Sequence, residues 1–469
     1  MLREKYRLKT LHLAIIALSM STVLSGCATY QTLPLSEKAS LLNDVETLSL
    51  QYKNYSKENS THKLDPTDGL DLNEAAILAV FANPDLRAKR AVLKVAEVQV
   101  FAAGLLPDPQ LGIGFDKPTG NTLGLVNAWS LGLGYDIIPL ITRTARVDAA
   151  RQTQSKVHLE LLWQEWQVIQ QARTLAVRMQ LEEQRLTLLQ NMLNLYQDRY
   201  HRSTQALQDG NITLDVNGTD LTALVDTLSQ INQLEQTHNQ TRHSFNLLLG
   251  LEPQATITIV PLSQGVSLDP EIVKSQLNKL PDIRPDLLAL KAGYESQEAR
   301  VRAEILAQFP SLGVGVNRTR DTGNVKAIGL SINLSLPIFS GNRGNIEIER
   351  ATREQLREEY KARLAQTTVD VYQLLELQTI LQRQLDSLQT YLPTLKVLVD
   401  RARVAYDRGD IQALTFLNME STWINKRLEQ ISLVQSTWEN HIALEALLAL
   451  PGFSANTNSL PSETKEITP

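Results

Sequence analysis

Four segments of the chain alternate strictly between apolar residues and small or polar residues. They cover residues 111–115, 129–137, 312–317 and 328–336. A period of two places the apolar side chains of each segment on one face of a strand, and its glycine, serine and asparagine residues on the other. This pattern is typical of membrane barrel strands, which have lipid outside and water inside. A half-buried soluble hairpin would explain any one segment alone.

Long helical segments follow each pair of strands. No proline occurs between residues 140 and 252, and only Pro393 interrupts residues 345–450. Gly210 and Gly409 mark the turns, so each stretch is predicted to form two long antiparallel helices. At 1.5 Å per residue, a helix over residues 143–208 would be about 100 Å long. Apolar residues from Leu374 to Val399 recur at intervals of three and four positions. One face of this helix is therefore expected to pack against another helix, and its other faces to contact water or a neighbouring chain.

The two halves of the chain repeat one another. At an offset of 201 positions, 13 of the 33 residues in 83–115 are identical to those in 284–316. The motif Asn83-Pro-Asp-Leu returns as Arg284-Pro-Asp-Leu, and Pro139 and Gly210 have counterparts in Pro337 and Gly409. Each half is predicted to run helix, two strands, two long helices. The first helix is expected to open where Asp71 or Asn73 caps it.

The N-terminus resembles a bacterial lipoprotein signal. Four basic residues precede an apolar stretch from Leu11 to Leu24, and Leu24-Ser-Gly-Cys27 follows. The apolar stretch is too short for a comfortable transmembrane helix. Cys27 is therefore the expected site of covalent diacylglycerol and N-acyl lipid. Residues 28 and 29 are Ala and Thr, and the absence of an aspartate that retains lipoproteins in the inner membrane favours the outer membrane.

These features give an expected domain organisation. The segments are a signal peptide (1–26), a lipid-anchored linker (27–70), a first repeat (71–252), an inter-repeat segment (253–283), a second repeat (284–452) and a flexible tail (453–469). The inter-repeat segment carries a short strand signal over residues 256–260 and a helix signal over residues 269–280.

Composition narrows the class of protein. The net charge is −5, so the chain lacks the excess of basic residues that is typical of nucleic-acid-binding proteins. Aromatics are only 5%, which favours helices packed through Leu, Ala and Val. One cysteine rules out an intramolecular disulfide. The mature chain has no run of 18 apolar residues, so no transmembrane helix is expected.

No catalytic or metal site is predicted. The seven histidines are scattered, and His238 and His243 are five residues apart, a poor spacing for shared ligation on one helix face. They are interpreted as surface histidines. Phosphate-binding loops, nucleophile elbows and Cys-His pairs are absent from the sequence. No cofactor is expected beyond the lipid on Cys27.

Four strands cannot close a barrel by themselves. An open edge in lipid leaves backbone groups unpaired, at several kcal/mol each. Two chains would supply eight strands, and three would supply twelve with room for a lumen. The membrane interpretation therefore requires oligomerisation without fixing the number three.

The lipobox, the paired Pro-Asp-Leu signatures, the Pro-Xaa-Leu-Gly-Xaa-Gly strand starts and the paired long helices together resemble the TolC-like outer-membrane efflux proteins. The resemblance covers roughly residues 70–452. It implies a mostly α-helical homotrimer, in which four strands per chain build a twelve-strand transmembrane β-barrel that an α-helical barrel continues through the periplasm of a Gram-negative bacterium. It also implies two partners, an inner-membrane pump and a periplasmic adaptor protein.

By the same resemblance, the hairpin tips form the periplasmic gate and the adaptor-docking surface. The tip residues are Asp209, Gly210, Asn211, Asp215, Gly409, Asp410, Thr415 and Asn418. Some family members carry an acidic ring six and nine positions after the second glycine, where this chain has Thr415 and Asn418. Asp215 and Asp220 could supply lumen charge instead, or lie on a solvated face. The glycines themselves need only permit the turns.

The functional hypothesis is a passive exit duct of an efflux or type I secretion system, without enzymatic activity. The alternative is a structural periplasmic coiled-coil lipoprotein that spaces two membranes without a pore. The four alternating strands argue against that alternative, because a spacer does not need them. The sequence does not separate drug, metal and protein export.

Overall fold

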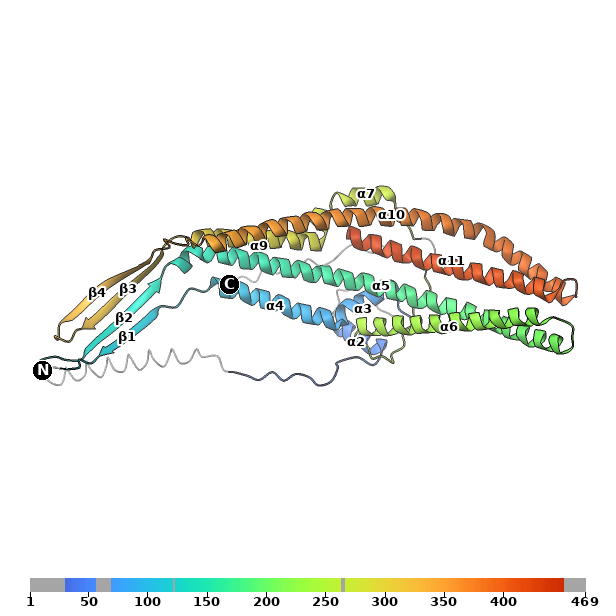
Figure 1. Ribbon diagram of the computed structural model, residues 1–469, viewed down its shortest axis with the longest axis horizontal. Coiled ribbons are helices and arrows are strands. Elements are labelled where there is room, and N and C mark those ends of the chain that lie inside the picture. The colour runs from blue at the N-terminus through green and yellow to red at the C-terminus, as the bar shows by residue number, and fades with distance from the viewer. Residues whose placement is uncertain (1–29, 56–68, 121–122, 263–265, 451–469) are drawn as a thin grey trace. The chain divides into compact units, whose positions relative to one another are not determined.

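The computed structural model describes residues 30–55, 69–120, 123–262 and 266–450 (Figure 1). The chain divides into a short unit that ends at Leu41 and a large unit that begins at Leu42. Residues 30–41 contain no helix or strand. Cys27, the predicted signal peptide over residues 1–26 and the predicted tail over residues 453–469 lie outside the described residues. All further description concerns the large unit.

The start of the first repeat is fixed by side-chain caps. The Asp71 carboxylate accepts hydrogen bonds from the backbone N–H groups of Asn73 and Glu74, both at 2.7 Å, and the Glu74 carboxylate accepts from the Asp71 N–H at 3.0 Å. This capping box starts α3 (Leu72–Ala82). Of the two predicted caps, Asp71 is therefore the one used.

The predicted first helix is divided in two at Asn83. The Asn83 side chain accepts from the Leu86 N–H at 2.9 Å and starts α4 (Pro84–Gly104), with Pro84 in the first turn. A proline at that position cannot donate a backbone hydrogen bond, so the chain changes direction there. In the second repeat, α9 (Pro285–Leu306) takes the corresponding place.

Four antiparallel strands form one sheet in the order β1-β2-β3-β4. They are β1 (Gln110–Asp116), β2 (Ala128–Asp136), β3 (Ser311–Arg320) and β4 (Lys326–Ser335). All four predicted strands are present, and β2 of the first repeat pairs with β3 of the second. The two repeats are therefore joined to one another through the pairing of these two strands.

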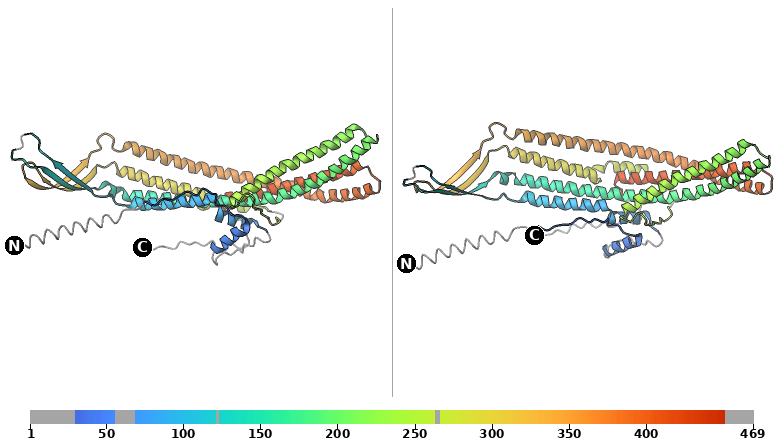
Figure 2. Two further views of the ribbon diagram at one scale, coloured as in Figure 1. Left: turned by 90° about the horizontal axis from the view of Figure 1, so that it is seen from below. Right: turned by 60° about the horizontal axis from the view of Figure 1, so that its bottom comes forward.

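Two long helical hairpins follow the strand pairs, as predicted. The first consists of α5 (Ile138–Gln208) and α6 (Leu214–Leu248), and the second of α10 (Arg343–Asp407) and α11 (Ala413–Leu448). Pro393 lies within α10 without ending it. Figures 1 and 2 show the strands at one end of the unit and the turns of both hairpins at the other.

Two connecting segments differ from the sequence expectation. Part of the predicted linker folds as α2 (Val45–Tyr55), because Leu48 is fully buried in the same core cluster as residues of α3. Residues 256–260 do not form a strand, since only an isolated bridge joins Ile259 to Leu70. The predicted inter-repeat helix is present as α7 (Pro270–Leu277), and the short α8 (Leu280–Ile283) follows it.

The hydrophobic core is distributed along the helices. One cluster holds residues of α2, α3, α5 and α6, among them Leu78, Ala172 and Phe245. A second cluster joins Leu193 of α5 and Ile231 of α6 to Ile424 of α11, so it connects the two repeats. No helix among the described residues combines the length and apolarity needed to cross a membrane.

Candidate functional site: the sheet and the helical tips

One face of the sheet is apolar and exposed. The strand register aligns its side chains in rows, for example Leu111, Leu133, Val316 and Leu330. On β4, Ile328 is 77% exposed and Leu330 is 85% exposed. Soluble monomers rarely expose contiguous apolar patches of this kind, so this face is suited to contact with lipid or another apolar surface.

The opposite face carries small and polar residues. Its rows include Gly112, Gly132, Asn317 and Gly329. A Cβ atom built on Gly329 would lie 2.6 Å from the Asn317 side-chain oxygen, so a larger residue there would displace that side chain. A face without bulky residues leaves space beside the sheet, as the inner wall of a water-filled channel requires.

The sheet has two unpaired edges. Among the described strands, β1 pairs only with β2, and β4 pairs only with β3. The outer backbone groups of β1 and β4 are therefore available to pair with further strands.

The two helical tips have the same backbone geometry. Gly210 and Gly409 adopt φ angles of +72° and +81°, and each closes its long helix with two hydrogen bonds. In the first tip the N–H of Asn211 donates to the Ala206 carbonyl oxygen at 2.8 Å, and in the second the N–H of Asp410 donates to Ala405, also at 2.8 Å. This glycine-dependent closure is the Schellman motif.

The structure places the other predicted tip residues on the surface. Asp209, Asn211 and Asp410 lie in the turns, and Thr415 and Asn418 lie in the first turns of α11. All five are exposed. They form no joint cluster of acidic groups, since Thr415 and Asn418 carry no charge.

Asp215 and Asp220 have different surroundings, although both lie on α6. Asp215 is exposed, and the neighbouring Thr213 hydroxyl lowers the pKa of its carboxyl group. Asp220 is 2% exposed and lies 2.6 Å from the Arg199 guanidinium on α5. The lumen-charge hypothesis therefore has an available carboxylate in Asp215, whereas Asp220 joins the two helices of the hairpin.

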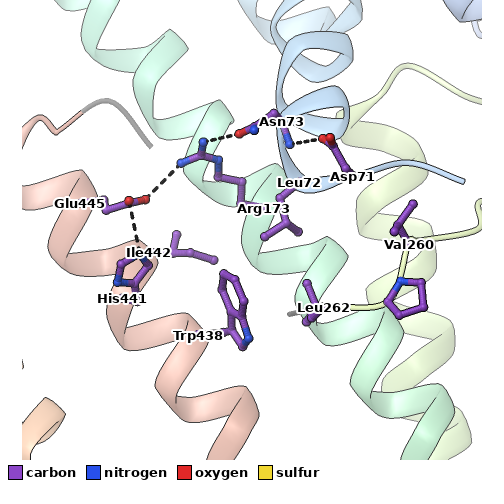
Figure 3. Close-up of a pocket in the computed structure, with 11 residues that line it drawn as sticks. Asp71, Leu72, Asn73, Arg173, Val260, Leu262, Trp438, His441, Ile442 and Glu445 are labelled. Carbon is purple, nitrogen blue, oxygen red and sulfur yellow. Dashed lines mark hydrogen bonds and ion pairs between the residues drawn. The ribbon is translucent and has the colours of Figure 1, made fainter. Parts of the chain in front are cut away.

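Another buried ion pair, between Arg173 and Glu445, joins the two repeats. Arg173 of α5 lies 3.2 Å from Glu445 of α11 and donates to the Asn73 side-chain oxygen at 2.6 Å (Figure 3). Burial lowers the pKa of Arg173, and Glu445 and Asp71 oppose that shift. The Arg173 charge is thus balanced by acidic groups from both repeats.

A pocket of about 200 Å³ adjoins this ion pair. Figure 3 shows it between α3, α5, α11 and the segment at residues 260–262, with His441 beside Glu445. The His441 ring lies 3.3 Å from the Glu445 carboxylate. This cluster is not predictable from the sequence, because its members are far apart in the chain and carry no motif.

His238 is not a simple surface histidine. Its Nδ1 atom lies 3.4 Å from the buried Glu182 carboxylate, which also accepts a hydrogen bond from the Thr241 hydroxyl at 3.2 Å. Burial raises the pKa of Glu182, and Thr241 and His238 oppose that shift. His243 is exposed, as predicted. Among the described residues, no group of three or more His, Cys, Asp or Glu side chains is placed to hold a metal ion.

Known proteins share this architecture. The chain is similar in structure to CusC, with a TM-score of 0.65 at 18% identity, over 90% of this chain and 99% of CusC. It is also similar to the CmeC outer membrane channel of Campylobacter jejuni, with a TM-score of 0.67 at 15% identity, over 90% of this chain and 92% of CmeC. At these identities the similarity establishes the fold.

Sequence relatives are similarly distant. A probable outer membrane lipoprotein, SilC of Salmonella typhimurium, is 24% identical over 56% of this chain and 59% of its own length. The cobalt-zinc-cadmium resistance protein CzcC of Cupriavidus metallidurans is 24% identical over 38% of this chain and 42% of its own. The chain thus spans about three fifths or less of the length of these relatives.

A family model described as outer membrane efflux protein matches residues 277–450, which include the second repeat from α9 to α11. The predicted location in the outer membrane agrees with this match and with the SilC relative, and is confirmed. The resemblance inferred from the lipobox, the repeats and the strand pattern is likewise confirmed: residues 277–450 match the model of the outer membrane efflux proteins, and the fold is that of known outer membrane channels.

Proposed function

We propose that this protein is a passive outer-membrane exit duct that works as a homotrimer. The observation that carries the proposal is the four-stranded sheet, which has one exposed apolar face, one small and polar face, and two unpaired edges. Three copies would join edge to edge into a twelve-strand barrel. The long helical hairpins would continue that barrel into the periplasm.

The energy of unpaired backbone supports closure of the sheet. In lipid, each unsatisfied N–H or C=O group costs several kcal/mol, and β1 and β4 each present such a row. Pairing β4 of one copy with β1 of the next would satisfy both edges, with no edge left once the ring closes. Strands of 9 to 10 residues in β2, β3 and β4 agree with the roughly 9–11 residues that a tilted membrane strand needs.

The decisive experiment is reconstitution of the detergent-purified, full-length protein in planar lipid bilayers. We expect stepwise ionic conductance, together with an oligomer whose electrophoretic mobility changes on heating. A water-soluble, non-conducting rod after substitution of Cys27 would instead support the structural coiled-coil spacer.

Metal cations are the substrate class that the relatives favour. Two of them are described as the cation efflux system protein CusC of Escherichia coli and as the cobalt-zinc-cadmium resistance protein CzcC. We expect a deletion strain to become sensitive to cobalt, zinc and cadmium, and to recover with the plasmid-borne gene. Sensitivity to organic drugs alone would overturn the cation assignment and leave the duct proposal in place.

The helical tips are the proposed gate and docking surface for a periplasmic adaptor, and an inner-membrane pump would supply the energy. The exposed turns at Asp209–Asn211 and Gly409–Asp410, with Asp215, Thr415 and Asn418 nearby, are accessible for such contacts. Cross-linking from a photoreactive side chain at Asn211 should capture the adaptor. Capture only from positions on the strands would contradict this assignment.

A further inference from the structure

The apolar face of the sheet changes character toward its hairpin end. Its row closest to the strand turns consists of Phe115, Trp129, Arg320 and Lys326. In the next row, Arg318 lies between Leu131 and Ile328. Arg318, Arg320 and Lys326 therefore lie together at the hairpin end of a face whose other side chains are aliphatic or aromatic.

These cations lack acidic partners on their own face. Arg320 lies directly opposite Lys326, and like charges in that position destabilise a strand pair. Arg320 donates to the Asn127 carbonyl oxygen at 2.7 Å, which leaves its charge uncompensated. In the described part of the chain, no ion pair includes Arg318, Arg320 or Lys326, and the apolar face of the four strands carries no carboxylate.

The nearby carboxylates are directed elsewhere. Asp116 pairs with Ala128 in a row of the opposite, small and polar face. Asp321 lies in the turn between β3 and β4, where its carboxylate accepts a hydrogen bond from the Val325 N–H at 2.9 Å. Among the described residues, the three cations therefore form a patch whose charge is open to an external anion.

Their depth in the membrane follows from strand length. The ten residues of β3 are about the number that a strand needs to cross the hydrocarbon, so in a membrane its last residue, Arg320, would lie at the boundary. Arginine on the lipid face is much less costly near the interface than at the membrane midplane. Phe115 and Trp129 in the same row match the aromatic girdle that marks such an interface.

We propose that Arg318, Arg320 and Lys326 form a binding site for phosphorylated lipid headgroups in the leaflet at the hairpin end of the sheet. The guanidinium groups would form bidentate hydrogen bonds with phosphate oxygens, and the lysine ammonium would attract the phosphate as a point charge. The acyl chains would cover the adjoining aliphatic rows at Ile328 and Leu330, which explains why the ligand is a lipid. This inference rests on the proposed function, since it needs the sheet to be in a membrane.

The test measures lipid binding to the intact, detergent-purified protein by native mass spectrometry. Diphosphoryl lipid A is compared with the same lipid after removal of both phosphates, and with inorganic phosphate as a competitor. The variant combines Arg318→Gln, Arg320→Gln and Lys326→Gln. The matched control combines Lys291→Gln, Arg300→Gln and Arg401→Gln, three exposed cations on the helices.

We expect the sheet variant to bind diphosphoryl lipid A at least about tenfold more weakly than the wild type, because several charge-assisted hydrogen bonds are lost. The helix control should bind as the wild type does. Equal binding by the sheet variant, or equally tight binding of the lipid without phosphates, would overturn the proposal. Displacement of the lipid by excess inorganic phosphate would overturn the choice of a lipid ligand.

Two further measurements separate this inference from the duct proposal. Conductance of the wild-type protein in bilayers tests the duct proposal. If the wild type conducts and the sheet variant binds lipid as the wild type does, only the lipid site is overturned. If the triple variant fails to insert, Arg318→Lys with Arg320→Lys keeps the charge but loses the planar fork. Weaker binding of diphosphoryl lipid A by that variant supports the site, and unchanged binding overturns it.

Discussion

A buried ion pair joins the two helices of the first hairpin. The Arg199 and Asp220 side chains are 10% and 3% exposed, and their ion pair connects α5 to α6 close to the first tip. A charged group that is buried without its partner is strongly unfavourable, so neither member of the pair can be removed cheaply. Asp226, further along α6, is exposed and provides a matched comparison.

Asp220→Ala should therefore loosen the first tip. Leaving Arg199 buried without a partner is expected to cost about 3–5 kcal/mol of local stability. Hydrogen–deuterium exchange of the amides around residues 199–220 should speed up, and Asp226→Ala should leave it unchanged. Unaltered exchange in Asp220→Ala would mean that the pair contributes nothing to the hairpin.

Glu182 should make stability depend on pH. Its pKa in the folded protein is raised above the usual value of 4.5, chiefly by burial, so the folded state resists its ionisation more than the unfolded chain does. Stability is then highest below that value and falls as pH rises through the folded pKa. Glu182→Gln removes this loss, so the melting temperature of the variant should rise relative to the wild type as pH increases from 4.5.

Circular dichroism melts in detergent at several pH values would measure this difference. Glu183→Gln is the control, because that side chain is exposed one position away. A difference between Glu182→Gln and the wild type that stays constant with pH would contradict the prediction.

The turns are the elements on which the hairpins depend. Gly409 has a φ of +81°, and its N–H donates to the Tyr406 carbonyl oxygen at 2.9 Å. Proline fixes φ near −65° and has no N–H, so Gly409→Pro conflicts with both features. Export should fail while membrane insertion persists, because the strands are at the other end of the unit.

Gly409→Asn is the control for that substitution, since asparagine tolerates the left-handed region. It should retain most of the resistance that the wild-type gene confers on a deletion strain. Full resistance with Gly409→Pro would speak against a role of the tip in export, and loss of insertion would show that the turn is needed for folding instead.

The elements were largely predictable from the sequence, and the contacts between them were not. Period-two alternation and the absence of prolines are local signals, so the four strands and both hairpins were found. The pair of Arg173 and Glu445 joins residues 272 positions apart, which no local pattern encodes. The burial of Asp220 was not predictable either, because it results from packing against α5 and from the ion pair with Arg199.

The lipid on Cys27 and the sheet would anchor the whole molecule in different ways. The strands of a closed barrel would hold the protein in the membrane by themselves, whereas the lipid would direct it there. Cys27→Ala should therefore lower abundance in the outer membrane more than it lowers the conductance of the molecules that arrive. Quantitative blots of membrane fractions beside single-channel recordings would measure both, and a loss confined to conductance would contradict this division.

Closure of the whole assembly can be tested at the two sheet edges. Contacts between unlike edges, β4 of one copy and β1 of the next, give a ring if the rotation closes and a filament if it does not. A cysteine in place of Ile113 on β1 can be combined, one at a time, with a cysteine in place of Ile328, Leu330 or Ile332 on β4. Disulfides form only where the Cα atoms come within about 4.4–6.8 Å, so the scan also reports the strand register.

We expect at least one of these pairs to yield a covalent ladder of one, two and three copies that stops at three. Acylation of Cys27 would leave the mature chain without another thiol, so each single-cysteine variant is a clean control that should give no trimer. A ladder that continues past three copies would indicate an open filament. The absence of any cross-link at all three positions would mean that β1 and β4 do not meet, and the twelve-strand barrel would have to be abandoned.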